Sequence, residues 1–232
     1  MKQVLTFLLT LPLCAQTPVT ATVTDVEGRP LSNVTVHGVN AANRQGQAKF
    51  NGSYTGQSSA ARIVFRANGF QSVVVAPTQG LRIVMRPVQP PPFPDCAYNP
   101  SNYLAEYRKE TFLQFLAAKP DKFRQDEDYR ENVYLISTVT GRHAMIHGWG
   151  PNYSHGTPGN YFLFHVFQEY AERTFEKNGI VIIDARGTTK DGKLWRSFGV
   201  PMELASYQTD DPDAAKQLDA ILDSACLMER LP

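Results

Sequence analysis

A cluster of prolines divides this chain into two parts with different residue patterns. The 232-residue sequence has 16 prolines, and six of them fall within one short stretch: Pro87, Pro90, Pro91, Pro92, Pro94 and Pro100. Consecutive prolines favour the extended polyproline II conformation, which acts as a semi-rigid spacer. We therefore predict two domains, at 18–88 and 99–232, joined by a proline-rich linker at 89–98.

The first part alternates apolar and polar residues over short stretches, as half-buried strands do. Turn signals recur between these stretches, and Asn68-Gly69 is typical of a tight hairpin. The polar residues 56–60 are expected to form a loop. Short strands separated by regular turns favour an all-β sandwich. Strands are predicted near residues 19–24, 34–36, 48–50, 62–67, 71–76 and 81–85.

Several spaced motifs in this part resemble the carboxypeptidase regulatory-like domain. Asp25 and the turn Gly28-Arg-Pro-Leu31 lead into the alternating strand Val34-Thr-Val36. Arg66-Ala-Asn-Gly-Phe70 is similar to the family's Arg-x-x-Gly-Phe hairpin, and Arg82–Pro87 to its closing strand. Gly46 followed by Phe50 resembles its Gly-x-Phe strand, although stretched, and the usual first-strand glycine is absent.

The resemblance implies a transthyretin-like β-sandwich, grouped with carbohydrate-binding-like folds, whose members are accessory modules and not catalysts. Peptidase activity does not follow from it. No histidine in the chain has a glutamate three residues on, as zinc carboxypeptidases do, and the HExxH motif of metalloproteases is absent.

The N-terminal residues predict export. Lys2 precedes the apolar run Val4–Leu13, which is too short to span a bilayer and fits a secretory signal peptide at 1–15. We expect a periplasmic or secreted protein without a transmembrane segment; lipid anchoring through Cys14 is the less favoured alternative. Cleavage would leave Cys96 and Cys226, which we predict to form a disulfide in an oxidising compartment, with two buried thiols as the alternative.

The second part mixes helix and strand patterns and resembles no family. Helices are predicted at about 100–119, at 161–177 and from Pro212, where Asp211 precedes a proline at the first helical position. Strands are predicted at 133–139, 143–149, 180–183, 194–198 and 202–207, with a hairpin at Asp191-Gly192. We expect an α+β domain with a mainly antiparallel sheet.

The segment 143–161 is the candidate ligand site, because it concentrates aromatic and imidazole side chains among glycines and prolines. His143, His147 and Trp149 share one strand face if 143–149 is extended. Three convergent imidazoles would suit Zn²⁺ or Cu²⁺, but no compact ligand spacing supports this, and no metal or other cofactor is predicted. There are two alternatives. One is a site where a glycan or small molecule stacks on aromatic rings, and the other is a loop with a structural role only. The predicted ligand-binding residues are His143, His147, Trp149, Asn152, Tyr153 and His155.

Other polar residues of this part are expected to be structural. Asp184 and Arg186 follow the strand 180–183 and are expected to form a same-face ion pair or to be exposed. No adjoining nucleophile or base motif points to catalysis there. Trp195 is expected in the core and Arg196 on the surface.

The charge distribution bears on partners. A formal net charge of +1 removes the simplest argument for nucleic acid as partner. Residues 18–88 carry seven basic and two acidic residues, whereas residues 95–232 carry 15 basic and 20 acidic residues, so opposite charges favour docking of the two parts. We predict an exported, non-catalytic binding or interaction protein, with a glycan or an envelope protein as partner. The alternatives are an exported hydrolase or metal-dependent enzyme with its site at 143–161, and a structural envelope protein.

Overall fold

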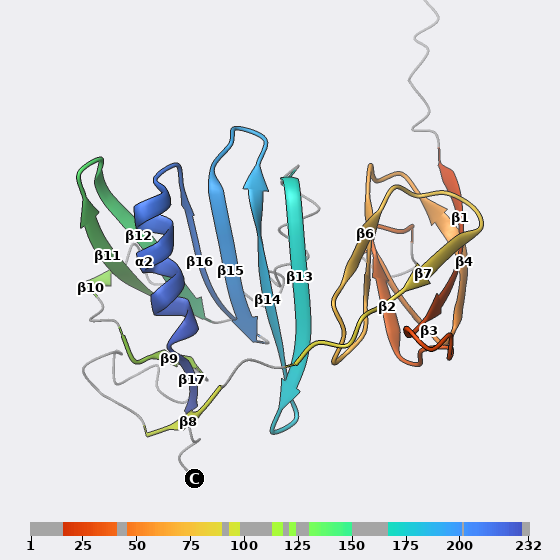
Figure 1. The fold of residues 1–232 in the computed structure, drawn as a ribbon, viewed down its shortest axis with the longest axis horizontal. Coiled ribbons are helices and arrows are strands. Elements are labelled where there is room, and N and C mark those ends of the chain that lie inside the picture. The colour runs from red at the N-terminus through yellow and green to blue at the C-terminus, as the bar shows by residue number, and fades with distance from the viewer. Residues whose placement is uncertain are drawn as a thin grey trace, which may run out of the picture.

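The computed structural model describes most of the chain and is mostly β. Its described residues are 16–40, 46–89, 93–97, 113–117, 121–123, 130–149, 167–200 and 202–228. Figure 1 shows several sheets and one helix among them, with the N-terminal strands beside the larger C-terminal sheet. No helix in these ranges is long and apolar enough to cross a membrane.

Two small sheets enclose one hydrophobic core in the N-terminal unit, defined here as residues 16–89. One sheet has the order β4-β1-β7 and the other the order β3-β2-β5-β6. Alternate residues of β1 and β2 point into this core, as the sequence pattern predicts, and Val19, Val23 and Val36 are fully buried. The strands are β1 (Thr17–Thr24), β2 (Val34–His37), β3 (Gln47–Phe50), β4 (Ser53–Ser58), β5 (Ile63–Arg66), β6 (Val73–Val75) and β7 (Leu81–Val84).

One strand of this unit was not predicted. The polar sequence Ser53–Ser58, part of which was expected to be a loop, forms β4 and pairs antiparallel with β1. It contributes only Tyr54 and Ser58 to the buried residues, so its composition carries little strand signal. Backbone pairing with β1 thus outweighs weak local propensity.

The C-terminal unit, residues 93–228, is built on a seven-stranded antiparallel sheet of order β10-β11-β12-β16-β15-β14-β13. The predicted hairpin at Asp191-Gly192 joins β14 to β15, and Gly192 adopts the positive φ that this turn requires. The strands are β10 (Asp121–Phe123), β11 (Arg130–Thr138), β12 (Gly141–Trp149), β13 (Phe167–Lys177), β14 (Ile180–Thr189), β15 (Leu194–Val200) and β16 (Glu203–Thr209).

The helix predicted from Pro212 is confirmed as α2 (Pro212–Asp223). The Asp211 carboxylate caps it by accepting hydrogen bonds from the backbone N–H groups of Asp213 and Ala214. Its buried stripe includes Leu218 and Leu222 and packs mainly on β16, β11 and β15. α2 therefore does not cover the part of the same sheet face that β13 and β14 form (Figure 1).

The other two helix predictions are wrong where the structure describes the residues. Residues 167–177, expected in a helix, form the strand β13, and Leu113–Phe115 form β9. The spacing of apolar residues in 161–177 fits a helix, but β13 gains a full antiparallel ladder with β14. The face of β13 that is buried against the N-terminal unit carries the polar residues Glu172 and Thr174, which hid the alternation.

The proline-rich segment is not a free spacer. Phe93 is buried against Phe175 and Phe198, and the Pro94 carbonyl accepts a hydrogen bond from the Leu227 N–H. β8 (Asp95–Cys96) then pairs with β17 (Ala225–Met228), which also pairs with β9. The predicted disulfide between Cys96 and Cys226 is confirmed.

The N-terminal unit contacts the edge strand β13 directly. The Gly69 and Ser72 N–H groups donate to the Thr174 and Glu172 carbonyls, both at 2.9 Å, so the loop after β5 continues the sheet. The Arg66 guanidinium forms a buried ion pair with Glu172, and Ser72 donates to the same carboxylate. A basic residue of the N-terminal unit thus pairs with an acidic residue of the C-terminal unit. The opposite charges of the two parts predict an attraction of this sign.

We predict that Asp211→Ala will destabilise the C-terminal unit. The substitution removes the cap of α2 together with hydrogen bonds from Thr138 and Thr140. A lost cap typically lowers the folding equilibrium constant about fivefold, so the urea midpoint should fall. Asp213→Ala, an exposed first-turn residue, is the matched control and should change the midpoint much less. Equal midpoints for the two variants would contradict this role of Asp211.

We also predict that Glu172→Gln will destabilise the contact between the two units. It leaves the Arg66 guanidinium, 6% exposed, without its charge partner, which typically costs about 3–5 kcal/mol. Replacing both residues by methionine should recover much of that loss, because no buried charge remains. Chemical denaturation followed at Trp195, which packs in the same contact, measures both effects. A double variant no more stable than Glu172→Gln would contradict the expectation.

Candidate functional site

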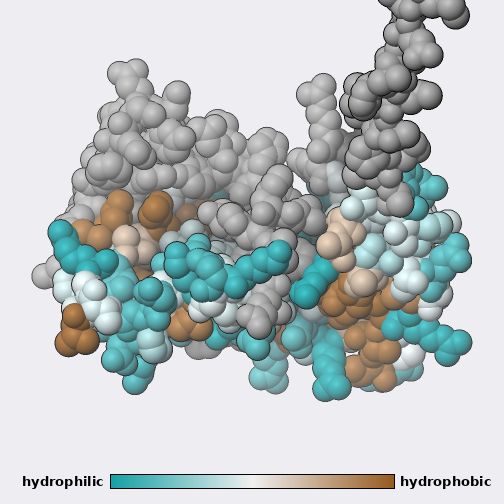
Figure 2. Space-filling view, turned by 90° about the horizontal axis from the view of Figure 1, so that it is seen from above, coloured by the Kyte–Doolittle hydropathy of each residue, from teal (hydrophilic) through white to brown (hydrophobic). Residues whose placement is uncertain are grey.

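The strongest concentration of charged side chains lies on the sheet face that carries α2, in the part over β13, β14 and β15. Figure 2, seen from above, shows hydrophilic residues interspersed with hydrophobic ones on the larger unit. Two hollows of about 230 and 360 Å³ share Arg173 and Arg186 as lining residues, and a third of about 380 Å³ also includes Arg186. We call the first two hollows together the arginine groove.

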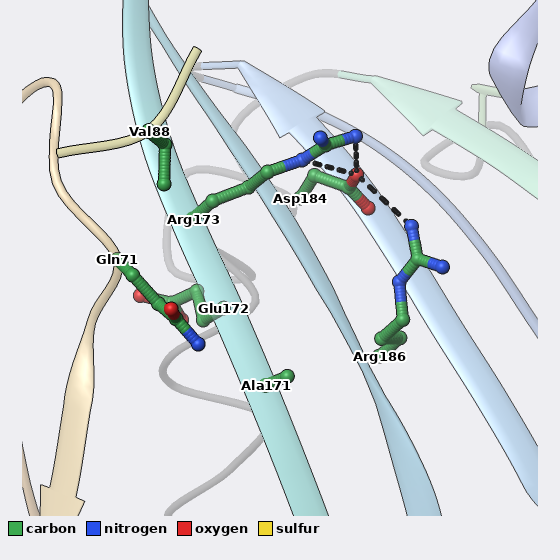
Figure 3. A pocket seen from close by; sticks show the side chains of 7 residues that line it. All are labelled: Gln71, Val88, Ala171, Glu172, Arg173, Asp184 and Arg186. Carbon is green, nitrogen blue, oxygen red and sulfur yellow. Dashed lines mark hydrogen bonds and ion pairs between the residues drawn. The ribbon is translucent and has the colours of Figure 1, made fainter. Parts of the chain in front are cut away.

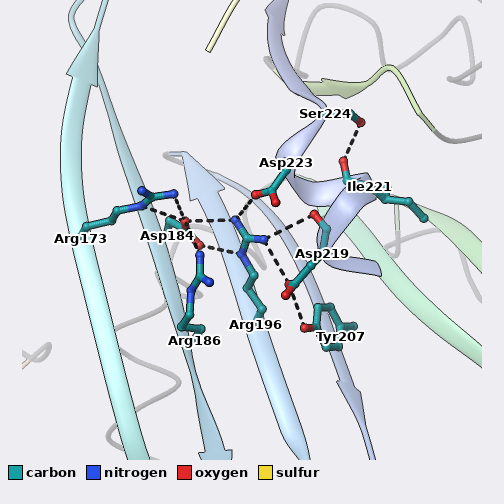
Figure 4. A network of polar contacts seen from close by, with 9 residues as sticks. All are labelled: Arg173, Asp184, Arg186, Arg196, Tyr207, Asp219, Ile221, Asp223 and Ser224. Carbon is teal, nitrogen blue, oxygen red and sulfur yellow. Dashed lines mark hydrogen bonds and ion pairs between the residues drawn. The ribbon is translucent and has the colours of Figure 1, made fainter. Parts of the chain in front are cut away.

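Asp184 organises the arginine groove. Its carboxylate accepts hydrogen bonds from Arg173 (Nε 3.0 Å, Nη2 2.7 Å) and from Arg196 (Nε 2.9 Å, Nη2 3.2 Å). The register of the sheet explains this, because Arg173 and Asp184 are direct partners in the β13–β14 ladder and Arg196 lies on the neighbouring strand β15. Figure 4 shows the guanidinium groups converging on this one carboxylate.

The pKa of the Asp184 carboxyl reflects these contacts. Burial alone would raise this pKa, but the hydrogen bonds and charge of Arg196, followed by those of Arg173, outweigh burial and hold it below its ordinary value. The carboxylate is therefore ionised at neutral pH and keeps both arginines in fixed orientations.

Arg196 links this carboxylate to α2. Its guanidinium also contacts Asp219 at 3.1 Å and Asp223 at 2.7 Å, and Asp219 accepts a hydrogen bond from Tyr207. Burial would lower the pKa of Arg196, but Asp184 and Asp223 raise it. Arg196 was expected at the surface; instead it is 2% exposed, because three carboxylates compensate its charge.

Arg186 is the least committed cation of the groove. It is about half exposed, and the ion pair with Asp184, one of the two expected alternatives, is present at a distance of 3.7 Å. That distance exceeds a hydrogen bond, and the Asp184 oxygens already accept four N–H donors. The Arg186 side chain lines all three hollows, so a small molecule in them can reach its guanidinium.

The N-terminal unit completes one end of the groove. Gln71 and Val88 line the 230 Å³ hollow together with Arg173, Asp184 and Arg186. Figure 3 shows Gln71 on one side of β13 and the guanidinium groups of Arg173 and Arg186 on the other, directed at Asp184. Docking of the loop after β5 onto β13 thus places groups from both units at one hollow.

Two of the three histidines predicted to bind a ligand, His143 and His147, are described and lie in two separate polar clusters. His143 and His147 share the inner face of β12, as predicted, but their Cα atoms are about 13 Å apart by strand geometry. His143 contacts Thr209 at 3.0 Å and Asp211 at 3.5 Å, whereas His147, fully buried, lies 2.6 Å from Glu203. The two imidazoles cannot reach one metal ion at that separation.

The rest of the predicted site falls largely outside the described residues. Trp149 is the last residue of β12, while Asn152, Tyr153 and His155 lie in a part that the structure does not describe. Within the described ranges, no group of three or more His, Cys, Asp or Glu side chains could hold a metal ion.

Comparison with protein-family models, with curated proteins and with solved structures found no match to this chain. The geometry of the arginine groove is therefore the observation from which a function is inferred.

The role of Asp184 can be tested by pH. Its depressed pKa means that its ion pairs stabilise the folded state above the ordinary aspartate pKa of 3.8 and that this stabilisation is lost as pH falls through the lower, folded-state value. We expect Asp184→Asn to be clearly less stable than the unsubstituted protein at pH 7, with the difference shrinking below pH 4. The exposed Asp210→Asn, measured by the same thermal unfolding series, should show no such dependence. A difference that stays constant from pH 7 to pH 3 would contradict this assignment.

Proposed function

We propose that this protein is an exported, non-catalytic binding protein that holds an anionic ligand in the arginine groove. The observation that carries the proposal is Arg186, a half-exposed guanidinium in a hollow beside Arg173, with one carboxylate partner at 3.7 Å. Guanidinium groups bind carboxylates and phosphates in a bidentate way, so the unused donors suit such a group.

Asp184 supports binding by fixing the groove before a ligand arrives. A guanidinium held by two charged hydrogen bonds loses little side-chain freedom when an anion binds, so less affinity is lost to ordering. Arg173 is held in this way and is about one-third exposed, so it can share a bound anion with Arg186.

The same contacts argue for binding and not for catalysis at this carboxylate. A general base must be able to accept a proton, and a nucleophile needs an accessible lone pair. Asp184 is buried, its pKa is lowered, and its oxygens accept hydrogen bonds from two arginines. These properties suit a fixed counter-ion.

Export and the two-domain organisation are part of the proposal. The disulfide Cys96–Cys226 supports an oxidising compartment, because such bonds persist there. The seven strands of the N-terminal unit, in two sheets around one core, support the proposed carboxypeptidase regulatory-like accessory domain. That resemblance implies a carbohydrate ligand for the accessory domain.

The proposal predicts weak but specific anion binding. Titration of isotope-labelled protein with acetate, inorganic phosphate and galacturonate should shift the NMR signals of residues near Arg173 and Arg186, and neutral galactose should leave them unchanged. Arg186→Gln should reduce the affinity at least fivefold, because the main unpaired donors are lost. Arg82→Gln, which removes an exposed arginine of β7, is the matched control and should bind normally.

Two results would overturn the proposal. One is that none of the three anions produces localised shifts. The other is equal weakening by Arg186→Gln and Arg82→Gln, which would indicate a general effect of net charge. Tighter binding of galacturonate than acetate, with galactose inactive, would support an acidic sugar as ligand.

A further inference from the structure

We infer that the ligand of the arginine groove joins its anionic group to a short apolar body, as an aryl-alkyl carboxylate does. This inference rests on the proposed anion binding and adds the chemical class of the rest of the ligand. It follows from the second hollow of the groove, because both arginines and apolar side chains line it.

The 360 Å³ hollow is lined by two kinds of side chain. Three arginines line it together with Asp223, whose carboxylate is paired with Arg196. Four apolar residues also line it, and we call them its apolar end: Phe93, Phe198, Leu222 and Ala225. These residues come from four different segments, namely the proline-rich segment, β15, α2 and β17. A purely hydrophilic anion would leave the apolar end filled with poorly bonded water, whereas an apolar group there would displace it.

The apolar end is held in place before binding. The Phe93 ring packs at 5.7 Å from Phe198 and 6.3 Å from Phe175, measured between ring centroids. Lys177 lies over the same ring at 5.6 Å and donates to the Phe93 carbonyl. The disulfide Cys96–Cys226 ties the segments of Phe93 and Ala225 together, so both walls are fixed.

The size of the hollow limits the ligand. Small-molecule sites usually have volumes of about 300–1,000 Å³, so 360 Å³ is at the small end. One aromatic ring or a chain of a few methylene groups, together with one carboxylate, matches that space. Arg173 and Arg186 line the same hollow as the apolar residues, so one small molecule can reach both kinds of side chain.

The test compares the binding of five related molecules to the full-length protein. NMR titration should give a dissociation constant for 3-phenylpropionate at least tenfold lower than that for acetate, because the ring leaves water. The neutral 3-phenyl-1-propanol should bind more weakly than 3-phenylpropionate. The unbranched series acetate, butyrate, hexanoate should show affinity rising with chain length in the unsubstituted protein.

Two variants locate the apolar part. Ala225→Leu fills the apolar end and should abolish the advantage of 3-phenylpropionate while leaving acetate binding in place. Ala220→Leu, at an exposed position of α2, is the control and should keep that advantage. If Ala225→Leu does not fold, the unbranched series in the unsubstituted protein decides the question alone.

The outcomes separate this inference from the proposed function. If acetate binds but neither the ring nor the longer chains improve affinity, the apolar inference is wrong and anion binding stands. If neither acetate nor 3-phenylpropionate binds near Arg186, both are wrong. If the neutral alcohol binds as tightly as 3-phenylpropionate, the site is apolar only and the anionic ligand is rejected.

Discussion

The contact between Arg66 and Glu172 determines how the two units are arranged. β13 is the last strand of a seven-stranded sheet, and such an edge exposes unpaired backbone groups that invite uncontrolled pairing. Here the segment Gly69–Ser72 hydrogen-bonds to part of that edge, and the buried ion pair fixes its position. Val64 and Val74 pack on Ala185 and Trp195 beside it. The geometry of the groove depends on this contact, because Gln71 is delivered to it by the same segment.

Neighbouring residues on β13 serve opposite sides of the sheet. Glu172 points toward the N-terminal unit, and Arg173 points toward Asp184 and the groove. This follows directly from the alternation of side chains along a strand. A shift of β13 by one residue would exchange its two faces and, depending on the direction, would place Glu172 beside Asp184 or Arg173 against Arg66. The register is therefore specified by charge as well as by apolar packing.

Sequence patterns predicted the elements whose local signals agree with their surroundings. The alternation in β1, the hairpin glycine Gly192 and the capped helix α2 were recognised because each signal is contained in a few residues. The helix prediction for β13 is wrong because Glu172 and Thr174 are polar and yet buried. Their contacts are with the N-terminal unit, which is distant in the sequence. The disulfide was predictable from the expected compartment and the cysteine count.

The candidate site was only partly visible in the sequence. The pairing of Asp184 with Arg186 follows from alternation within one strand, and it is present. Arg173 and Arg196 join them only because β13, β14 and β15 are adjacent, and the helix prediction for 161–177 concealed that adjacency. The conspicuous histidines at 143 and 147 instead belong to polar clusters at Asp211 and Glu203. Unusual composition drew attention to one segment, whereas the converging charges come from ordinary residues on three strands.

The disulfide has a mechanical consequence. Cys96 and Cys226 are 130 residues apart, and the described strands β9 to β16 and the helix α2 all lie inside the loop that they close. If the N-terminal unit is pulled away from the end of the chain after β17, the force runs along the chain to Cys96. From there it passes through the disulfide to β17. The N-terminal unit can then be peeled from β13 under tension while the seven-stranded sheet, enclosed in a covalent ring, carries little of the load.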